Sequence, residues 1–403
     1  MSRFLFIVPP LTGHINPTVA VGAELASRGH EVAWTGPAFA LAKLLPEGAI
    51  LFPADEGFSA SDMQRIAEIG RGLRGAEAFR FLWKDFILPL GRAMLPAVER
   101  AVYAFQPHTL IVDQQALAGA GLARERNLCW ATSATTSSDL VDPFETFPLF
   151  ADWLRDELIS FQQGLGISHE SASVGDLRFS EHLVLAFSTK ELVGDTNTFP
   201  KEWLFVGPAI EKRPGAATFP WNWLDPARRH VLVTLGTISG AIGHTFFANA
   251  IAAAQQMHEH IQMIVIAPDG VVQAVPPNVI VLPSVPQLEL LPHIDVVVCH
   301  AGHNTVCETL AHGIPLVVAP IRDDQPIIAQ QVTNSGAGIR MKFGRAKIED
   351  FVNALTAVLT DDSYRESARV IQDSFRNAGG SAKAAAALED LALRSSLSMA
   401  IAG

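Results

Sequence analysis

The chain has 403 residues, of which 49% are hydrophobic and 18% are charged, a composition typical of a folded globular protein and unlike that of a disordered or fibrous one. Its 30 basic and 41 acidic side chains give a formal net charge of −11, which argues against a nucleic-acid partner and requires any anionic ligand to be held by local groups. The length predicts two domains of roughly 200 residues each.

The cysteines indicate a reducing compartment, and the amino end indicates a strand and not a signal peptide. Cys129, Cys299 and Cys307 lie in or beside apolar runs, which predicts free thiols and no disulfide framework. The first apolar segment is short and ends in Pro9 and Pro10, so it indicates a strand rather than a signal peptide. No apolar stretch approaches the length of a membrane span. We therefore expect a cytoplasmic protein without a membrane span.

Short apolar runs rich in β-forming residues alternate with helical patterns along the chain, which is typical of βαβ units around parallel sheets. The predicted strands are 4–8, 31–34, 109–112, 128–131 and 182–187 in the first half, and 230–235, 262–267, 279–282, 295–299 and 315–319 in the second. The repetition predicts two similar halves, each built on its own parallel sheet.

A segment rich in Pro and Gly, 207–226, lies between the two halves and is typical of an exposed connector. The predicted organisation is a first domain at 1–208, a linker at 209–228, a second domain at 229–380 and a terminal helix at 381–403. The Ala- and Leu-rich pattern indicates that helix, but leaves open which domain it packs on.

Two helical segments of the first half, 58–104 and 142–165, carry many aromatic side chains. They are either core helices or the walls of an apolar ligand cavity, since small-molecule pockets are mostly apolar with a few polar groups. The candidates for the cavity are Phe81, Trp83, Phe86 and Phe144.

The segment after the first predicted strand contains the first candidate for chemistry, His14. Asn16 is a good N-cap and Pro17 suits the first position of a helix, which we expect to end near Gly29. This start would leave His14 in the loop at the carboxyl end of the strand, the edge at which open α/β sheets bind ligands.

A neutral imidazole can take a proton from a hydroxyl group, so His14 is a candidate general base, although it could merely close the loop. Asp113 follows the predicted strand 109–112 and lies at the same kind of edge. Its carboxylate could bond one imidazole nitrogen, fix the tautomer and stabilise the imidazolium. Alternatively, Asp113 caps a helix that starts near Gln115.

In the second half, the buried run 295–299 leads through His300 and Gly302 into a helical pattern. Backbone N–H groups around 302–305 would then point outward from the positive end of a helix, which predicts an anion site. A diphosphate could be held there locally despite the acidic net charge, and His300 could donate a hydrogen bond to it.

Several neighbours of this site allow more than one interpretation. Thr305 and Glu308 have the spacing of a capping box, so Glu308 either caps the helix start or accepts hydrogen bonds from ribose hydroxyls. Gly236 and Thr237 follow the predicted strand 230–235 and either contact phosphate or form an ordinary turn. The nearby His and Cys residues match no closed zinc pattern, so we expect no metal. The absence of Walker, Gly-x-Ser-x-Gly and Gly-x-Gly-x-x-Gly motifs argues against an ATPase, a hydrolase and a dehydrogenase.

Together these residues resemble the family-one UDP-dependent glycosyltransferases, particularly the bacterial macrolide and carotenoid glycosyltransferase-like members, over nearly the whole chain. The likeness rests on Gly13-His14-Ile15-Asn16-Pro17, the strand end at Asp113, Leu235-Gly236-Thr237, Pro286-Gln287, His300-Ala301-Gly302, Glu308 and Asp324-Gln325. It implies an α/β GT-B fold, in which two Rossmann-like domains face across a cleft, with the acceptor in the first and the donor in the second. A final helix often crosses back to the first domain.

The resemblance also implies an inverting glycosyltransferase that moves a sugar from a nucleoside-diphosphate sugar, UDP-glucose or a similar donor, to a hydroxyl of a small apolar acceptor. His14 would be the base and Asp113 its partner. His300 and its turn would hold the diphosphate, Glu308 the ribose, and Asp324 with Gln325 the sugar. The full set of expected donor contacts is Gly236, Thr237, Ser284, Val285, Gln287, His300, Gly302, His303, Asn304, Thr305, Glu308, Asp324 and Gln325. No metal or further cofactor is expected, because helix-end amides and His take the place of a cation.

Two positions depart from the family pattern. Ser284 stands where many members have a Trp that stacks on uracil, which leaves the donor base open between uridine and thymidine, and His303 replaces the usual Gly or Trp after Gly302. The expected partners are a nucleotide sugar and a small hydrophobic acceptor, in a monomer or homodimer. Two alternatives stay open: a nucleotide-sugar 2-epimerase on the same fold, which would convert donor alone, and a non-catalytic nucleotide-sugar-binding protein, favoured if His14 and Asp113 lie too far apart to bond.

Overall fold

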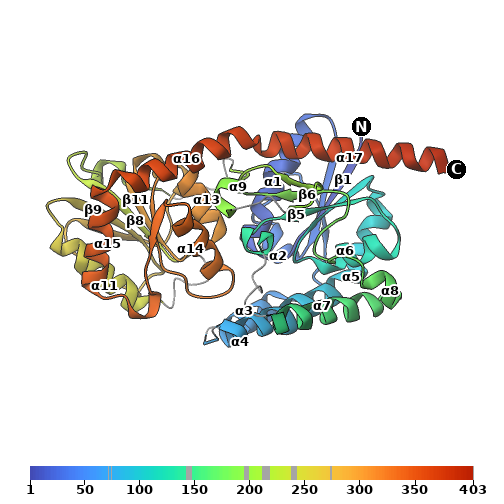
Figure 1. The fold of residues 1–403 in the computed structure, drawn as a ribbon, viewed down its shortest axis with the longest axis horizontal. Coiled ribbons are helices and arrows are strands. Elements are labelled where there is room, and N and C mark those ends of the chain that lie inside the picture. Colours follow the sequence, from blue (N-terminus) through green and yellow to red (C-terminus); the bar gives the residue numbers. More distant parts are fainter. Residues whose placement is uncertain are drawn as a thin grey trace. The chain divides into compact units, whose positions relative to one another are not determined.

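The computed structural model of the chain describes all residues except 71, 74, 142–147, 195–198, 211–217, 237–242, 273–274 and 403. It divides into two compact units. The first comprises residues 1–189, 196–211 and 378–403, and the second comprises 190–195 and 212–377. Each unit has its own parallel sheet, covered by helices on both faces (Figure 1).

The first unit is built on a seven-stranded parallel sheet in the order β3-β2-β1-β4-β5-β6-β7. Its strands are β1 (Arg3–Ile7), β2 (Glu31–Gly36), β3 (Ile50–Pro53), β4 (Thr109–Asp113), β5 (Trp130–Ala134), β6 (Val184–Ala186) and β7 (Trp203–Phe205). All five predicted strands exist, with ends shifted by a few residues. The two edge strands, β3 and β7, were not predicted because each is short and has little of the apolar run of a strand buried on both faces.

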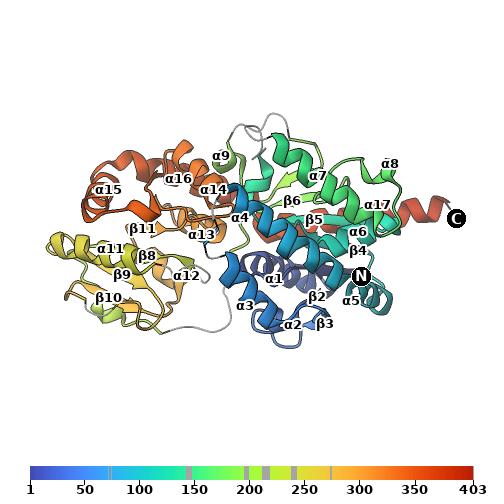
Figure 2. The same ribbon diagram turned by 90° about the horizontal axis from the view of Figure 1, so that it is seen from below.

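The helices of the first unit pack on the sheet in two groups, each with its own core cluster. They are α1 (Thr12–Ser27), α2 (Ala38–Leu41), α3 (Ala60–Gly70), α4 (Gly75–Phe81), the π-helical turn η1 (Leu82–Ile87), α5 (Leu88–Phe105), α6 (Leu117–Glu125), the 3₁₀ turn η2 (Ser137–Leu140), α7 (Pro148–Gln163), α8 (His169–Ala172) and α17 (Gly380–Ala402). Figure 2 views this unit from the side of α3, α4 and α7.

The last helix, α17, packs against α1 in the first unit, although nearly all of the preceding helix, α16, belongs to the second (Figure 1). Ala384, Ala385 and Leu388 are buried in the same core cluster as the first strand. At the surface, Glu389 accepts hydrogen bonds from Arg28 at 2.8 Å and pairs with His30 Nε2 at 2.7 Å. These contacts answer the question that the sequence left open.

The second unit has a six-stranded parallel sheet in the order β10-β9-β8-β11-β12-β13. Its elements are β8 (Arg229–Thr234), β9 (Ile261–Ile266), β10 (Val279–Leu282), β11 (Val296–Cys299), β12 (Leu316–Val318), β13 (Gly338–Arg340), α9 (Lys190–Val193), α11 (His244–Gln256), α12 (Gln287–Leu290), α13 (His303–Ala311), α14 (Gln325–Asn334), α15 (Ile348–Thr360), α16 (Asp362–Ala378), and the 3₁₀ turns η3 (Trp221–Trp223), η5 (Leu291–His293) and η6 (Phe343–Arg345). The five predicted strands are present and the edge strand β13 was not predicted.

Both sheets contain the same reversal of strand order. In the first, β2 and β4 flank β1; in the second, β9 and β11 flank β8. In doubly wound sheets, ligands bind at the carboxyl ends of the strands beside such a reversal. The fold therefore marks two places for a site, one at the ends of β1 and β4 and one at the ends of β8 and β11.

Within the described residues, no helix combines the length and the apolar character needed to cross a bilayer.

Candidate functional site

At the reversal of the first sheet, His14 and Asp113 lie in direct contact. His14 Nδ1 is 2.9 Å from Asp113 Oδ1 and 3.0 Å from Oδ2. The Asp113 side chain is fully buried, whereas 13% of the His14 side chain is exposed. The strands bring them together because β1 pairs with β4, with Ile7 opposite Val112. One imidazole nitrogen is thus bonded to a buried carboxylate.

A third side chain, Thr135, completes this cluster. Its hydroxyl donates to Asp113 Oδ2 at 2.8 Å and lies 2.8 Å from His14 Nδ1. The backbone N–H of Gln115 donates to Asp113 Oδ1 at 2.9 Å. These contacts hold the carboxylate against Nδ1 of the imidazole and favour the tautomer with its proton on Nδ1, because that N–H can then donate to the carboxylate.

The predicted start of the first helix is wrong. The helix α1 begins at Thr12 with Leu11 before it, so Asn16 is not the N-cap and Pro17 lies inside the helix. The Leu11 carbonyl accepts from the N–H groups of both His14 and Ile15, which starts the helix five residues earlier than predicted. His14 therefore lies in a helical first turn and not in a loop, which restrains its backbone.

Asp113 does not cap the next helix, which begins at Leu117 after Ala116. Its side chain instead binds Gln115 N within the connecting turn. The alternative in which Asp113 caps a helix starting near Gln115 is thus wrong. The carboxylate instead accepts a hydrogen bond from the turn and bonds the imidazole.

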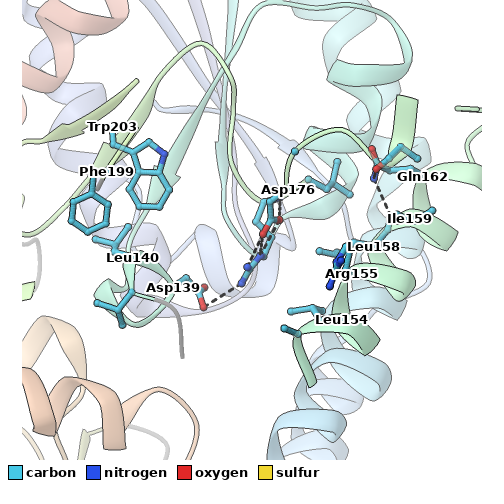
Figure 3. A pocket seen from close by; sticks show the side chains of 16 residues that line it. Asp139, Leu140, Leu154, Arg155, Leu158, Ile159, Gln162, Asp176, Phe199 and Trp203 are labelled. Carbon is cyan, nitrogen blue, oxygen red and sulfur yellow. Dashed lines mark hydrogen bonds and ion pairs between the residues drawn. The ribbon is translucent and has the colours of Figure 1, made fainter. Parts of the chain in front are cut away.

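A pocket of about 430 Å³ opens in the first unit, and one of its lining residues, Asp139, is bonded by Gln114, the chain neighbour of Asp113. In Figure 3, Phe199 and Trp203 form one side, Leu154 and Leu158 of α7 the other, and Asp139 with Asp176 lies between them. The remaining lining residues are Leu140, Val141, Ala151, Arg155, Ile159, Gln162, Ala172, Gly175, Leu177 and Arg178. The pocket combines apolar walls with a few charged groups, as small-molecule sites do.

The charged groups of the pocket form a row. Arg178 binds Asp176 through Nη2 at 2.6 Å and reaches Asp139 with Nη1 at 3.4 Å. Gln114, next to Asp113, donates to Asp139 Oδ2. Burial raises the pKa of Asp139, against the effects of Arg178 and Gln114, while in Asp176 the ion pair with Arg178 outweighs burial and lowers the pKa.

The aromatic cavity candidates occupy a different place. Trp83 and Phe86 are buried in the core cluster beneath α5, and neither lines the pocket, so for these two rings the core-helix interpretation fits. Phe81, at the end of α4, is half-buried and is also absent from the pocket lining. Trp83 nevertheless supports the pocket, because its ring lies 5.7 Å from the Arg178 guanidinium carbon. Phe144 lies outside the described residues.

At the reversal of the second sheet, His300 follows β11 and is held between two glycines. A Cβ atom on Gly236 would lie 2.6 Å from His300 Cε1, and one on Gly302 would lie 2.5 Å from Nε2. Gly236 also has a positive φ of 69°, which side-chain-bearing residues rarely adopt. Only glycine at both positions leaves room for the imidazole.

Burial lowers the pKa of His300 to about 4, a shift that a hydrogen bond with the Thr234 backbone opposes and Arg322 reinforces. The ring is therefore neutral near pH 7 and keeps one N–H donor. Its Nδ1 has no hydrogen-bond partner in the part of the chain that the structure describes. Beside it, α13 begins at His303 with Gly302 as N-cap. The N–H groups of this helix end and the imidazole together provide donors for an anion.

Glu308 does not form the predicted capping box. Because α13 begins at His303, Thr305 lies inside its first turn and Glu308 one turn further on. Glu308 is buried and accepts a hydrogen bond from Gln287 Nε2 at 2.7 Å. Two expected donor contacts are thus joined to each other, and the alternative of a ribose ligand stays a prediction.

The motif at the start of α14 is also ordered by internal bonds. Gln325 Oε1 accepts from the N–H groups of Ile321 and Arg322 at 2.8 and 3.2 Å. Asp323, before the predicted sugar ligand Asp324, has a positive φ of 55°. This left-handed residue turns the chain between β12 and α14 at the carboxyl edge of the sheet.

The other expected donor contacts differ in exposure. Ser284 is exposed, and three are half-buried: Val285, Asn304 and Thr305. His303 is buried, with its Nε2 3.5 Å from Cys307 Sγ, and Thr237 lies outside the described residues. Burial raises the pKa of Cys299 to about 12 and also raises that of Cys307, so both thiols are protonated at neutral pH. Among the described residues, no group of three or more His, Cys, Asp or Glu side chains is arranged to hold a metal ion.

Sequence reasoning missed Thr135, Asp139 and Arg178. Thr135 directly follows β5, so its place at a strand's carboxyl end was the one available signal. Asp139 and Arg178 come from a turn and a long connection without regular periodicity, and only the folded chain brings them together.

Comparison with known proteins extends these observations. Residues 221–374 match the family model of UDP-glucuronosyl and UDP-glucosyl transferases. Over the whole length, the chain is 28% identical to 4'-demethylrebeccamycin synthase of Lentzea aerocolonigenes, covering 93% of this chain and 96% of that protein. It is also 28% identical to demethyllactenocin mycarosyltransferase of Streptomyces fradiae, with 97% and 87% covered.

Solved structures show the same fold. A calicheamicin glycosyltransferase superposes with a TM-score of 0.76 at 21% identity, covering 97% of this chain and 98% of the other. A spinosyn rhamnosyltransferase complexed with thymidine diphosphate gives 0.74 at 21% identity, with 96% and 100% covered. The chain is therefore an enzyme that transfers a sugar, built on the two-domain GT-B fold. The match over residues 221–374 and the full-length relatives agree with the resemblance to the family-one glycosyltransferases that the sequence predicted.

Proposed function

We propose that the enzyme moves a sugar from a nucleoside-diphosphate sugar to a hydroxyl of a small apolar acceptor, with inversion at the anomeric carbon and His14 as the general base. The observation that carries this proposal is the bonding of His14 Nδ1 to the buried Asp113 and to Thr135. A proton on Nδ1 leaves the lone pair of Nε2 available to an acceptor hydroxyl.

The buried carboxylate matters most once His14 has taken the proton. The imidazolium then carries a positive charge 2.9 Å from Asp113 Oδ1, in surroundings that exclude most water. A carboxylate in this position stabilises the charged ring and keeps it oriented. The alternative of a non-catalytic binding protein was favoured if the two groups lay too far apart to bond, so their short contact argues against it.

The donor contacts belong to the second unit. The N-terminal end of α13 and the neutral His300, whose ring Gly236 and Gly302 leave room for, suit a diphosphate in a protein whose overall charge repels anions. Gln287, Glu308, Asp324 and Gln325 are proposed for the ribose and sugar hydroxyls. These groups need no metal, because helix-end N–H groups and an imidazole N–H can stabilise the leaving diphosphate.

The proposed step is one displacement. The acceptor O–H proton moves to His14 Nε2 while the acceptor oxygen bonds to the anomeric carbon. The bond from that carbon to the diphosphate oxygen breaks on the opposite side, its electron pair leaves with the nucleoside diphosphate, and the configuration inverts. The names of the relatives, 4'-demethylrebeccamycin synthase and demethyllactenocin mycarosyltransferase, favour a natural product as acceptor.

Replacing His14 by Ala tests the base. We expect turnover to fall by on the order of 10²- to 10⁴-fold, because the proton acceptor is lost, with nucleotide affinity unchanged by calorimetry. His169→Ala, an exposed histidine of α8 in the same unit, is the matched control and should keep normal turnover. Near-normal turnover of His14→Ala over several acceptors would exclude the assignment.

Two further measurements define the reaction. Incubating UDP- and TDP-sugars without acceptor, followed by a search for an epimer, separates transfer from epimerisation. Anomeric configuration read by NMR in product and donor decides between inversion and retention, and retention would overturn the single displacement.

A further inference from the structure

The 430 Å³ pocket of the first unit has a polar group that the proposed mechanism does not use. Its volume lies within the roughly 300–1,000 Å³ of sites that bury drug-sized ligands. Asp139 connects it to the reacting groups, since Gln114, which bonds Asp139, is the neighbour of Asp113 in the chain. Asp139 is also close enough to His14 for the charges of the two groups to interact.

The guanidinium of Arg178 is committed mainly to Asp176. Nε and Nη2 of Arg178 bond the Asp176 carboxylate at 2.6–3.1 Å, whereas Nη1 is 3.4 Å from Asp139 Oδ1. Stacking near Trp83 and Phe179, at 5.7 and 5.3 Å, holds the guanidinium in this position. Both carboxylates thus interact with the same guanidinium, and the contact of Asp139 is the longer and weaker of the two.

Among the described residues, the two other arginines near the pocket do not neutralise the Asp139 carboxylate. Arg155 lines the pocket but pairs with Asp152 on α7, and Arg124 acts on Asp176 and bonds Gln162. Asp139 Oδ2 accepts from Gln114, which leaves Oδ1 with one long contact and further capacity to accept. In Figure 3, Asp139 lies between the aromatic pair Phe199 and Trp203 and the apolar face of α7.

We propose that this pocket holds the apolar body of the acceptor and that Asp139 selects acceptors with a second hydrogen-bond donor, a hydroxyl or an amine, remote from the reacting hydroxyl. The inference rests on the proposed function and adds the chemical class of acceptor to it. A partly compensated carboxylate in a largely apolar wall attracts a donor and repels a carbonyl oxygen at the same place. Asp139 is thereby a specificity-determining residue, distinct from the Asp113 that orients the base.

The test uses a pair of probes that differ at one group. Estradiol and estrone share a phenolic hydroxyl and an apolar body, but the far end carries a hydroxyl donor in estradiol and a carbonyl acceptor in estrone. Their affinities are measured by calorimetry on the full chain without nucleotide sugar. We expect estradiol to bind more tightly by on the order of tenfold, the effect of one hydrogen bond to a charged group.

Two variants and a control assign the effect. Asp139→Asn should abolish the preference for estradiol, because an amide can donate to the carbonyl as well as accept from the hydroxyl. Ala151→Phe, on the partly exposed wall of α7, should weaken both steroids by filling the pocket. Asp156→Asn removes an exposed carboxylate of the same helix that does not line the pocket, and it should leave the preference unchanged.

Equal binding of the two steroids by the wild-type chain, or binding of neither, would overturn the assignment. So would an Asp139→Asn protein that melts normally and keeps the preference. Because binding is measured without a donor sugar, a selective pocket in a protein that transfers no sugar would instead refute the proposed function.

Discussion

Replacing His300 by Asn should remove a specific pH dependence from the stability of the second unit. The folded chain keeps this imidazole neutral, since burial lowers its pKa to about 4, whereas the unfolded chain takes up the proton near the ordinary value of about 6.5. The stabilising effect is therefore complete above about pH 6.5 and is lost progressively as the pH falls toward 4.

The size of the effect follows from the two pKa values. A difference of about 2.5 units corresponds to about 3 kcal/mol in the free energy of unfolding at the acid limit. At about pH 5, where the unfolded His300 is almost fully protonated and the folded one is not, about 2 kcal/mol should already be lost. Asn cannot titrate, so His300→Asn should lack this component whatever its stability at neutral pH.

The assay is urea unfolding followed by circular dichroism, for both proteins at about pH 7.5 and about pH 5. Comparing the two pH-dependent losses cancels the titration of all other groups. An NMR titration of the His300 ring gives the pKa directly. Equal losses in the two proteins, or a ring that titrates near its ordinary value, would refute the reasoning.

Two further outcomes follow from the site geometry. Thr135→Val should keep the fold and lower kcat by about tenfold, because it removes a hydrogen bond to the Asp113 carboxylate. Thr135→Ser retains the hydroxyl and should keep kcat near that of the wild type. A kcat unaffected by the valine would show that the hydroxyl does not support Asp113. Gly236→Ala should lower the melting temperature more than Gly270→Ala and weaken UDP or TDP binding, because both glycines have positive φ but only at Gly236 would the new Cβ meet the His300 ring. Equal melting temperatures with unchanged nucleotide affinity would contradict the close packing of His300.

The sequence predicted the buried strands and, through them, the contact between His14 and Asp113. An apolar run bounded by turn residues identifies a central strand, and the residue that follows it necessarily lies at the carboxyl edge. His14 and Asp113 are 99 positions apart in the chain, and they meet because β1 lies next to β4.

Local signals misled where long-range packing decides the backbone. Asn16 and Pro17 have the chemistry of a helix start, yet the helix begins at Thr12 and encloses Pro17. The Thr18 hydroxyl donates to the Ile15 carbonyl at 2.7 Å and accepts from the Trp34 indole at 3.1 Å, tying this turn to β2. No pattern within a short window of sequence contains such a partner.

The same limit explains the donor and pocket residues. Glu308 resembles a capping residue when only Thr305 is considered, but its partner is Gln287, 21 positions away. The row of Asp139, Arg178 and Asp176 draws on two separate segments. Motif spacing can find residues on one turn, but it cannot find side chains that meet only after the sheet has formed.

The placement of α17 has a consequence for biosynthesis. Ala384, Ala385 and Leu388 are translated after the whole second unit, yet they bury apolar surface in the same core cluster as β1 of the first unit. During synthesis, the apolar side chains that α17 covers therefore stay exposed until this helix emerges. A fragment that stops before Gly380 would leave those side chains exposed permanently, so the amino-terminal half should aggregate on expression unless the α17 peptide is supplied in trans.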